Sequence, residues 1–217
     1  MIEAVLFDWD GTLSDSRPAL LASWYECSEA VLGRRYPASE AEEDVVFTRP
    51  GGEIWPAIAS DAEQAEQLFE AFQEAYARHS QSLKAFPGVA DMLTAVRAAG
   101  ISTAVVTSKG RRRYEPDAAR IGLAEHIDVA VCAGEAPPKP DPGGVLEALT
   151  RLETAPDRAA MVGDTPVDIL AAVGGGVTAV GVEWGHSGGE ALREAGAHVI
   201  VRTPAELAEV LTRGVPS

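Results

Sequence analysis

Short apolar runs recur along the chain and are separated, in most intervals, by longer stretches with helical periodicity. The runs are continuously apolar and rich in Val, Ile and Ala, so they predict strands that are buried on both faces of a sheet. Strands that alternate with helices predict β-α units, and therefore an α/β fold with a doubly wound parallel sheet and right-handed crossovers. The predicted strands cover residues 4–7, 102–106, 127–132, 159–162 and 177–182.

The helical stretches carry apolar residues at spacings of three and four, as the buried face of a helix requires. A last short strand over residues 198–201 and a final helix over residues 204–212 complete the pattern. The helices predicted between strands cover residues 89–99, 114–121, 144–152 and 167–173.

The interval between the first two predicted strands is different. Residues 15–85 carry helical periodicity and no convincing strand, which is more chain than one crossover needs. We expect a helical domain of residues 16–85, inserted into a core domain of residues 1–15 and 86–217, with a turn back toward the sheet at Phe86-Pro87-Gly88. The aromatic residues of the insertion fit a helical core better than a ligand site: Trp24, Tyr25, Phe69, Phe72 and Tyr76.

Composition and charge limit the classes of function that are compatible with this chain. A hydrophobic fraction of 46% and a charged fraction of 24% are typical of a folded globular protein. The chain has 33 acidic against 18 basic residues and a formal charge of -15. This charge is opposite in sign to the positive charge that is typical of nucleic-acid-binding proteins. A small anionic partner is still compatible, provided that local cations or a metal offset the overall field.

The cysteine content and the N-terminal sequence indicate in which cellular compartment the protein is expected. Cys27 and Cys132 are too few for a disulfide framework and have no ligand-like spacing. The N-terminal segment lacks the layout of a secretory signal, and no stretch is long enough to span a membrane. We expect a cytoplasmic protein with no membrane partner, and the sequence leaves its oligomeric state open.

Polar residues follow the predicted strands at the points where they end. In open α/β sheets, ligands bind at the carboxyl ends of the strands, so these residues should converge. They form two acidic loops, a hydroxyl-bearing loop and a loop with a lysine: DWDGT at residues 8–12, TSK at 107–109, KPDP at 139–142 and GDTPVD at 163–168.

These residue types indicate phosphate chemistry with a metal. Asp8, Asp10 and Asp164 would repel one another unless a cation or a shared proton relieved the repulsion. Ligands that are all oxygen favour Mg²⁺, and the lack of an accompanying His or Cys cluster disfavours zinc. Thr107 and Lys139 would complete a phosphate cradle as a hydroxyl donor and a fixed positive charge.

The four motifs DWDGT, VVTSK, KPDP and GDTPVD, in this order, resemble those of the haloacid-dehalogenase superfamily of phosphohydrolases. The resemblance covers essentially the whole chain, and residues 86–109 and 180–207 resemble its phosphoglycolate-phosphatase-like branch. It implies a Rossmann-like core, and it implies that the helical insertion is a cap domain.

The resemblance also implies a role for each matching residue. Asp8 would be the nucleophile, and Asp10 the acid/base, whose backbone carbonyl also reaches Mg²⁺. Lys139 would neutralise charge on the phosphate and on the nucleophile. Asp164 would bind the metal and Asp168 would support it from outside the ligand shell. The remaining phosphate-binding residues would be Gly11, Thr107 and Ser108.

Chemistry and resemblance together favour hydrolysis of a small phosphate monoester, with phosphoglycolate as one candidate. An acid two residues after the nucleophile argues against dehalogenation and against phosphonate cleavage, according to the same resemblance. A sugar-phosphate mutase would use the same Asp8 and Asp10 pair and is the nearest alternative. A binding module that has kept the fold without catalysis is a third interpretation.

Several other residues have a structural and a functional interpretation. Arg49, in a polar break of the insertion, is a candidate substrate contact, because the corresponding loop in relatives with a cap faces the active site. The basic run at residues 111–113 favours a solvated turn over an anion site. We expect Trp184 and His186 to be packing or rim residues, and the glycines at 174–176 to end a helix.

Overall fold

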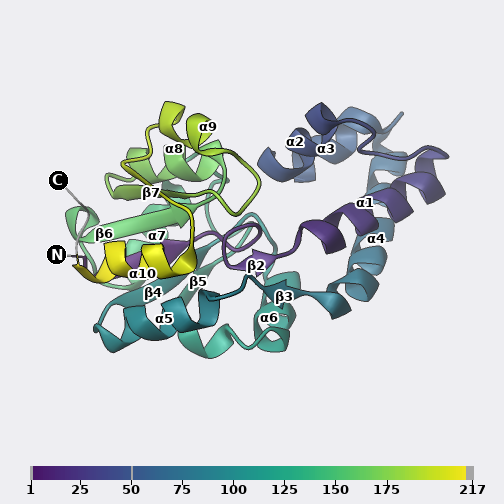
Figure 1. Cartoon of the computed structure of the whole chain (residues 1–217). Helices are drawn as coiled ribbons and strands as arrows, with labels where there is room; N and C mark the ends of the chain where they lie inside the picture. Colours follow the sequence, from purple (N-terminus) through teal and green to yellow (C-terminus); the bar gives the residue numbers. More distant parts are fainter. Residues whose placement is uncertain (1, 50, 214–217) are drawn as a thin grey trace. The chain divides into compact units, whose positions relative to one another are not determined.

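The computed structural model describes residues 2–49 and 51–213. The chain forms two compact units, of which the first joins Met1–Asp15 to Lys84–Ser217 and the second is Ser16–Leu83. Figure 1 shows both units, coloured along the sequence.

The first unit contains a parallel sheet, which confirms the predicted fold class. Within the described residues it has six strands in the order β5-β4-β1-β6-β7-β8, and every neighbouring pair is parallel. The chain first moves outward from β1 to β4 and β5, and then returns to the other side of β1. The order therefore reverses between β1 and β6, which is where ligands bind in doubly wound sheets. The strands are β1 (Ala4–Phe7), β4 (Ser102–Val106), β5 (Val129–Val131), β6 (Ala159–Gly163), β7 (Thr178–Val182) and β8 (Val199–Val201).

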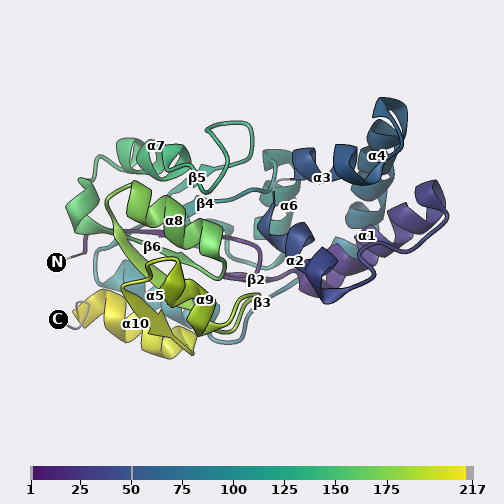
Figure 2. The same ribbon diagram turned by 90° about the horizontal axis from the view of Figure 1, so that it is seen from above.

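Alternate side chains of the strands enter two hydrophobic layers, one on each face of the sheet. In β1, Val5 and Phe7 belong to one layer, and Ala4 and Leu6 to the other. Helices α5, α6 and α10 supply the first layer, and helices α7, α8 and α9 supply the second (Figures 1 and 2). Both faces are covered, so the strands consist mostly of apolar residues. The helices are α5 (Val89–Ala98), α6 (Arg111–Arg120), α7 (Gly143–Arg151), α8 (Pro166–Gly174), α9 (Gly189–Glu194) and α10 (Pro204–Arg213).

The second unit is helical. Trp24 and Trp55 stack with their ring centroids 4.0 Å apart, and Phe72 lies 5.3 Å from both rings. Phe69 is 45% exposed, and Tyr25 is half-buried with the guanidinium of Arg35 over its ring. The prediction that these two residues belong to the helical core was therefore wrong. The unit comprises α1 (Arg17–Leu32), α2 (Glu40–Thr48), α3 (Gly51–Ile58), α4 (Ala62–His79) and the short 3₁₀ helix η1 (Ser80–Ser82).

Short elements of the first unit differ from the prediction. Strand β2 (Ser14–Asp15) pairs antiparallel with β3 (Lys84–Ala85). Lys84 and Ala85 therefore lie in the first unit, although the sequence analysis assigned them to the insertion. Two-residue strands have no alternation that a sequence pattern could reveal.

Among the helices of the described residues, none is both long enough and apolar enough to cross a bilayer.

Candidate active site

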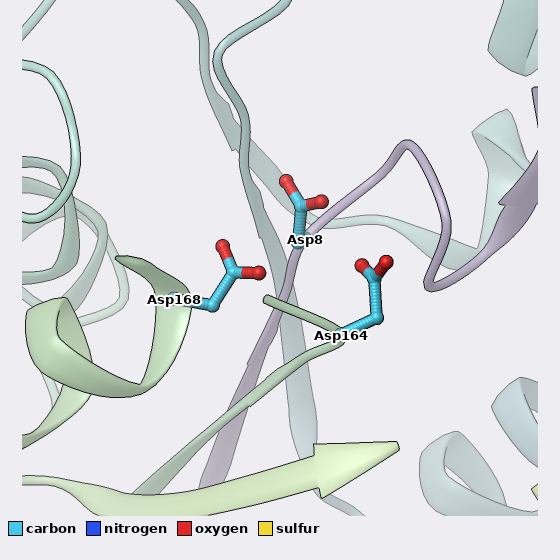
Figure 3. A group of neighbouring side chains, drawn as sticks. All are labelled: Asp8, Asp164 and Asp168. Carbon is cyan, nitrogen blue, oxygen red and sulfur yellow. The ribbon is translucent and has the colours of Figure 1, made fainter. Parts of the chain in front are cut away.

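Three buried carboxylates meet where the strand order reverses. Asp8 directly follows β1, Asp164 directly follows β6, and Asp168 lies in the first turn of α8. Among the described residues, these three offer carboxylate oxygens that all lie within 4.8 Å of one another. Figure 3 shows the three carboxyl groups gathered around one common space.

Lys139 provides the positive charge of this cluster. Its Nζ donates hydrogen bonds to Oδ1 of Asp8 at 2.7 Å and to Oδ1 of Asp168 at 2.5 Å. It also donates to the carbonyl of Val106, the last residue of β4, at 3.2 Å. The lysine predicted from the KPDP motif thus lies buried beside Asp8.

Asp164 is held from two sides. The hydroxyl of Thr12 donates to its Oδ1 at 2.8 Å, and the backbone N–H of His186 donates to its Oδ2 at 2.8 Å. A Cβ atom at Gly11 or at Gly185 would collide with the Asp164 side chain. Close approach to Asp164 therefore explains why both positions are glycine.

Asp168 joins the helix start to the cluster. Its Oδ2 accepts hydrogen bonds from the backbone N–H of Thr165 at 3.0 Å and from the Thr165 hydroxyl at 2.6 Å. Its Oδ1 accepts from Lys139. The residue thus caps α8 and fixes the position of Lys139 at the same time.

Asp10 lies in different surroundings from Asp8. Its Oδ1 accepts a hydrogen bond from Nζ of Lys109 at 2.8 Å, and the same Nζ donates to Oδ2 of Asp117 at 2.9 Å. The sequence analysis assigned no role to Lys109 or Asp117. The available signal was the position of Lys109 directly after Thr107 and Ser108, but a lysine in a loop is usually solvated.

Thr107 and Ser108 follow β4, the neighbour of β1. Thr107 is buried, and its Oγ1 accepts a hydrogen bond from the backbone N–H of Lys109 at 3.0 Å. Its own hydroxyl hydrogen therefore remains available for donation. Ser108 is exposed.

The charges of the cluster are unbalanced. Burial, reinforced by Asp168 and Asp164, raises the pKa of Asp8 well above its usual range, although Lys139 opposes the shift. Burial and the charge of Asp168 raise the pKa of Asp164 to about 7, against the opposing hydrogen bonds from His186 and Thr12. Burial lowers the pKa of Lys139, but the carboxylates of Asp168 and Asp8 outweigh it and raise that pKa overall. A divalent cation with a preference for oxygen ligands fits this excess of negative charge.

The other residues that the sequence singled out lie at the surface, in packing contacts or at a helix end. Arg49 is exposed at the end of α2 in the second unit, and Pro50 beside it lies outside the described residues. Nε1 of Trp184 donates to the carbonyl of Thr12 at 3.0 Å, which makes Trp184 a packing residue. The glycines at 174–176 end α8, as predicted.

The basic run is not a solvated turn. Arg111 begins α6, and it forms ion pairs with Glu135 at 2.7 Å and with Glu115 at 3.1 Å. Its guanidinium also donates to the carbonyl of Ala130 at 2.8 Å. The prediction was wrong because the acids that offset a positive charge at a helix start come from both α6 and a distant loop.

The chain is similar to known proteins in sequence and in fold. The family model described as haloacid dehalogenase-like hydrolase matches residues 5–182. N-acetylmuramic acid 6-phosphate phosphatase of Pseudomonas aeruginosa is 33% identical over 219 residues, which cover 99% of this chain and 96% of that protein. Phosphoglycolate phosphatase of Pseudomonas putida is 32% identical over 197 residues, which cover 85% of this chain and 71% of that protein. The crystal structure of a hydrolase from Pseudomonas syringae has a TM-score of 0.84 at 26% identity, and the match covers 98% of this chain and 99% of that one.

Proposed function

Since this chain belongs to the haloacid dehalogenase-like hydrolases and is a phosphatase of that family, we propose that it hydrolyses a small phosphate monoester through an aspartyl-phosphate on Asp8. One observation carries the proposal: Asp8 and Asp10, two residues apart, have different lysine partners, Lys139 and Lys109. Different surroundings allow paired acids to take different roles. We assign Asp8 to bond formation and Asp10 to proton transfer.

The reaction has two displacements. In the first, a carboxylate oxygen of Asp8 attacks the phosphorus, the bond from phosphorus to the ester oxygen breaks, and Asp10 donates a proton to that departing oxygen. In the second, water attacks the phosphorus of the aspartyl-phosphate while Asp10 takes a proton from the water. The bond between phosphorus and the Asp8 oxygen then breaks. Inorganic phosphate leaves, and both aspartates return to their starting states.

Other side chains of the site would bind the phosphoryl group. Lys139 offsets the negative charge that the nucleophile and the phosphate bring together. Thr107 donates its hydroxyl hydrogen to a phosphoryl oxygen, since its Oγ1 already accepts from the chain. Gly11 and Ser108 complete this set through contacts with the phosphate.

We also propose a magnesium cofactor, because carboxylate oxygens in a buried cluster suit this ion. Asp8, Asp164 and the backbone carbonyl of Asp10 would hold it, with Asp168 in support. When bound, Mg²⁺ would neutralise charge on the carboxylates and on the transferring phosphoryl group. Excess chelator should abolish turnover and added Mg²⁺ should restore it, whereas full activity in chelator would remove the metal from the proposal.

The names of two relatives suggest a substrate class. Phosphoglycolate and N-acetylmuramic acid 6-phosphate are phosphate monoesters that also carry a carboxylate. We propose that the substrate of this chain has the same two groups, with Arg49 as the cation that selects the carboxylate. Arg49→Ala should then reduce the preference for carboxylated esters and leave p-nitrophenyl phosphate hydrolysis nearly unchanged. An unchanged ranking of esters would reject Arg49 as the selecting residue.

A sugar-phosphate mutase would use the same pair of aspartates but return the phosphoryl group to a sugar hydroxyl. Product analysis with phosphorylated glucose distinguishes the two, because a mutase forms an isomer and a phosphatase releases inorganic phosphate. A protein without turnover under any of these conditions would instead be a binding module.

The decisive experiment detects the covalent intermediate. Rapid-quench reaction with a ³²P-labelled ester, followed by peptide mapping, should find the label on Asp8 as an acid-stable, hydroxylamine-sensitive acyl phosphate. Release of inorganic phosphate from a panel of carboxylated and uncarboxylated esters would then rank the substrates by kcat/KM. Label on any other residue would overturn the mechanism.

A further inference from the structure

We propose that Lys109, anchored by Asp117, is a positioning residue that holds the carboxylate of Asp10 in the orientation needed for proton transfer. This inference rests on the proposed function, since it concerns the acid/base of that reaction. It adds two residues to the site, and both act through Asp10.

The side chains of Lys109 and Asp117 are 1% and 2% exposed, whereas that of Asp10 is 23% exposed. A buried ammonium is stable only when it is paired and fully hydrogen-bonded. Lys109 is therefore fixed between the two carboxylates rather than free to follow solvent.

Asp117 lies on the buried side of α6, and its Oδ1 accepts a hydrogen bond from Arg120 one turn later at 3.0 Å. Its Oδ2 accepts from Lys109. The far end of the Lys109 interaction thus belongs to a packed helix, while the near end reaches the loop that carries Asp10.

Lys109 donates to Oδ1 of Asp10, so that oxygen is occupied by a hydrogen bond. Within the described residues, Oδ2 is then the oxygen of Asp10 that is open to exchange a proton. General acid catalysis depends on orientation, because the proton must be within hydrogen-bond reach of the departing oxygen.

Lys139 serves Asp8 and Asp168, while Lys109 serves Asp10 and Asp117. Without Lys109, the carboxylate of Asp10 would lose the hydrogen bond that holds its Oδ1. Two separate lysines keep the nucleophile and the acid/base in separate hydrogen-bond networks.

The test compares two leaving groups. An alkyl phosphate needs an acid to leave, whereas p-nitrophenolate leaves with little help, so the ratio of the two kcat/KM values reports acid catalysis in the first displacement. Partial misfolding lowers both values equally and leaves the ratio unchanged. Asp10→Asn should lower the alkyl-to-aryl ratio by about 100-fold.

Lys109→Met should lower the same ratio by about 10-fold, because the acid remains but is no longer oriented. Asp117→Asn keeps the lysine and loosens its anchor, so the ratio should fall by about 3-fold. Arg111→Gln is the matched control, since Arg111 lies near the start of the same helix and pairs with Glu135 instead. Its ratio should match that of the wild type.

The outcomes separate the inference from the function on which it rests. If Asp10→Asn lowers the ratio and Lys109→Met does not, Lys109 has no positioning role and the proposed mechanism stands. If Asp10→Asn itself leaves the ratio unchanged, the acid role fails and the inference fails with it. Should Lys109→Met not fold, the double variant Lys109→Met and Asp117→Leu removes both buried charges and takes its place, with the same 10-fold fall expected.

Discussion

Among the described residues, the first unit of this chain buries charged side chains as well as apolar ones, whereas the second buries aromatic side chains and no charged ones. In the described part of Ser16–Leu83 the buried polar side chains are all serines, and the ion pairs, such as those of Arg17 with Glu43 and of Arg78 with Glu26, lie at the surface. Its core instead contains packed aromatic rings around Trp24, of which the ring of Trp55 is stacked on it. The charged residues buried in the first unit are Asp8, Lys109, Asp117, Lys139, Asp164 and Asp168.

The two kinds of buried side chain have different effects on the stability of the fold. Burial of aromatic rings lowers the free energy of the folded state, whereas burial of several like charges raises it unless partners compensate. The raised pKa values of Asp8 and Asp164 reflect such incomplete compensation. We therefore expect substitutions in the charged cluster to act mainly on activity, and substitutions in the aromatic cluster to act mainly on stability.

The largest expected effect is that of Asp8→Asn. Loss of the nucleophile should reduce turnover by at least about 10⁴-fold. The melting temperature of the metal-free protein should not fall, because the substitution removes one of three crowded negative charges and leaves Lys139 paired with Asp168. Phosphate release and thermal unfolding measure the two quantities. A large loss of stability together with the loss of activity would show that the cluster is structural.

Trp24→Ala should give the opposite result. Removal of a fully packed indole should reduce the free energy of unfolding of the helical unit by about 3–5 kcal/mol. Denaturant unfolding followed by circular dichroism measures the loss. Phe69→Ala is the control, since Phe69 is half exposed and should cost about 1 kcal/mol or less. Equal losses for the two variants would contradict the stacked core.

Magnesium and pH test the charge imbalance in the first unit. A raised pKa means that protonated Asp164 stabilises the metal-free fold at low pH, and that this contribution is lost as the pH rises from 3.8 through about 7. Metal binding must displace that proton, so Mg²⁺ should bind at least about 10-fold more tightly at pH 8 than at pH 5. The rise in melting temperature caused by Mg²⁺ should accordingly be larger at pH 8. Asp164→Asn should remove most of this pH dependence, and an equal effect of Mg²⁺ at both pH values would contradict it.

The smallest expected effect is that of Arg78→Met in the second unit. Glu26 pairs with Arg78 and His79 at the surface, and the hydrogen bonds from these two residues lower the pKa of Glu26. An exposed ion pair contributes little, so the free energy of unfolding should change by about 0.5 kcal/mol or less. Denaturant midpoints at low and high salt measure it. A loss comparable to that of Trp24→Ala would mean that charge also stabilises the helical unit.

Long, regular elements could be predicted from the sequence. Strands β1 and β4 have the predicted bounds, because a continuously apolar run directly reflects burial on both faces of a sheet. Helix α9 (Gly189–Glu194) was missed, since a six-residue helix that begins at a glycine has too few apolar positions to show a period. Helix α6 begins at Arg111 rather than Tyr114 because distant acids stabilise its basic first turn.

The candidate site was predictable to the extent that its residues follow strands. The carboxyl ends of parallel strands share one edge of a sheet. The positions of Asp8, Thr107 and Asp164 directly after apolar runs were therefore sufficient to predict that these residues lie at that edge. The sequence alone thus determined the class of fold, the edge that carries the site and the residue types available there.

Only the tertiary structure decided which charged side chains form ion pairs with each other. Lys139 and Asp8 are 131 residues apart in the sequence, and Lys109 and Asp10 are 99 apart. No local pattern records such a distance, because an ion pair depends on the positions of two side chains in space and on the solvent excluded around them. For this reason the sequence predicted one lysine at the site, and the fold brought two.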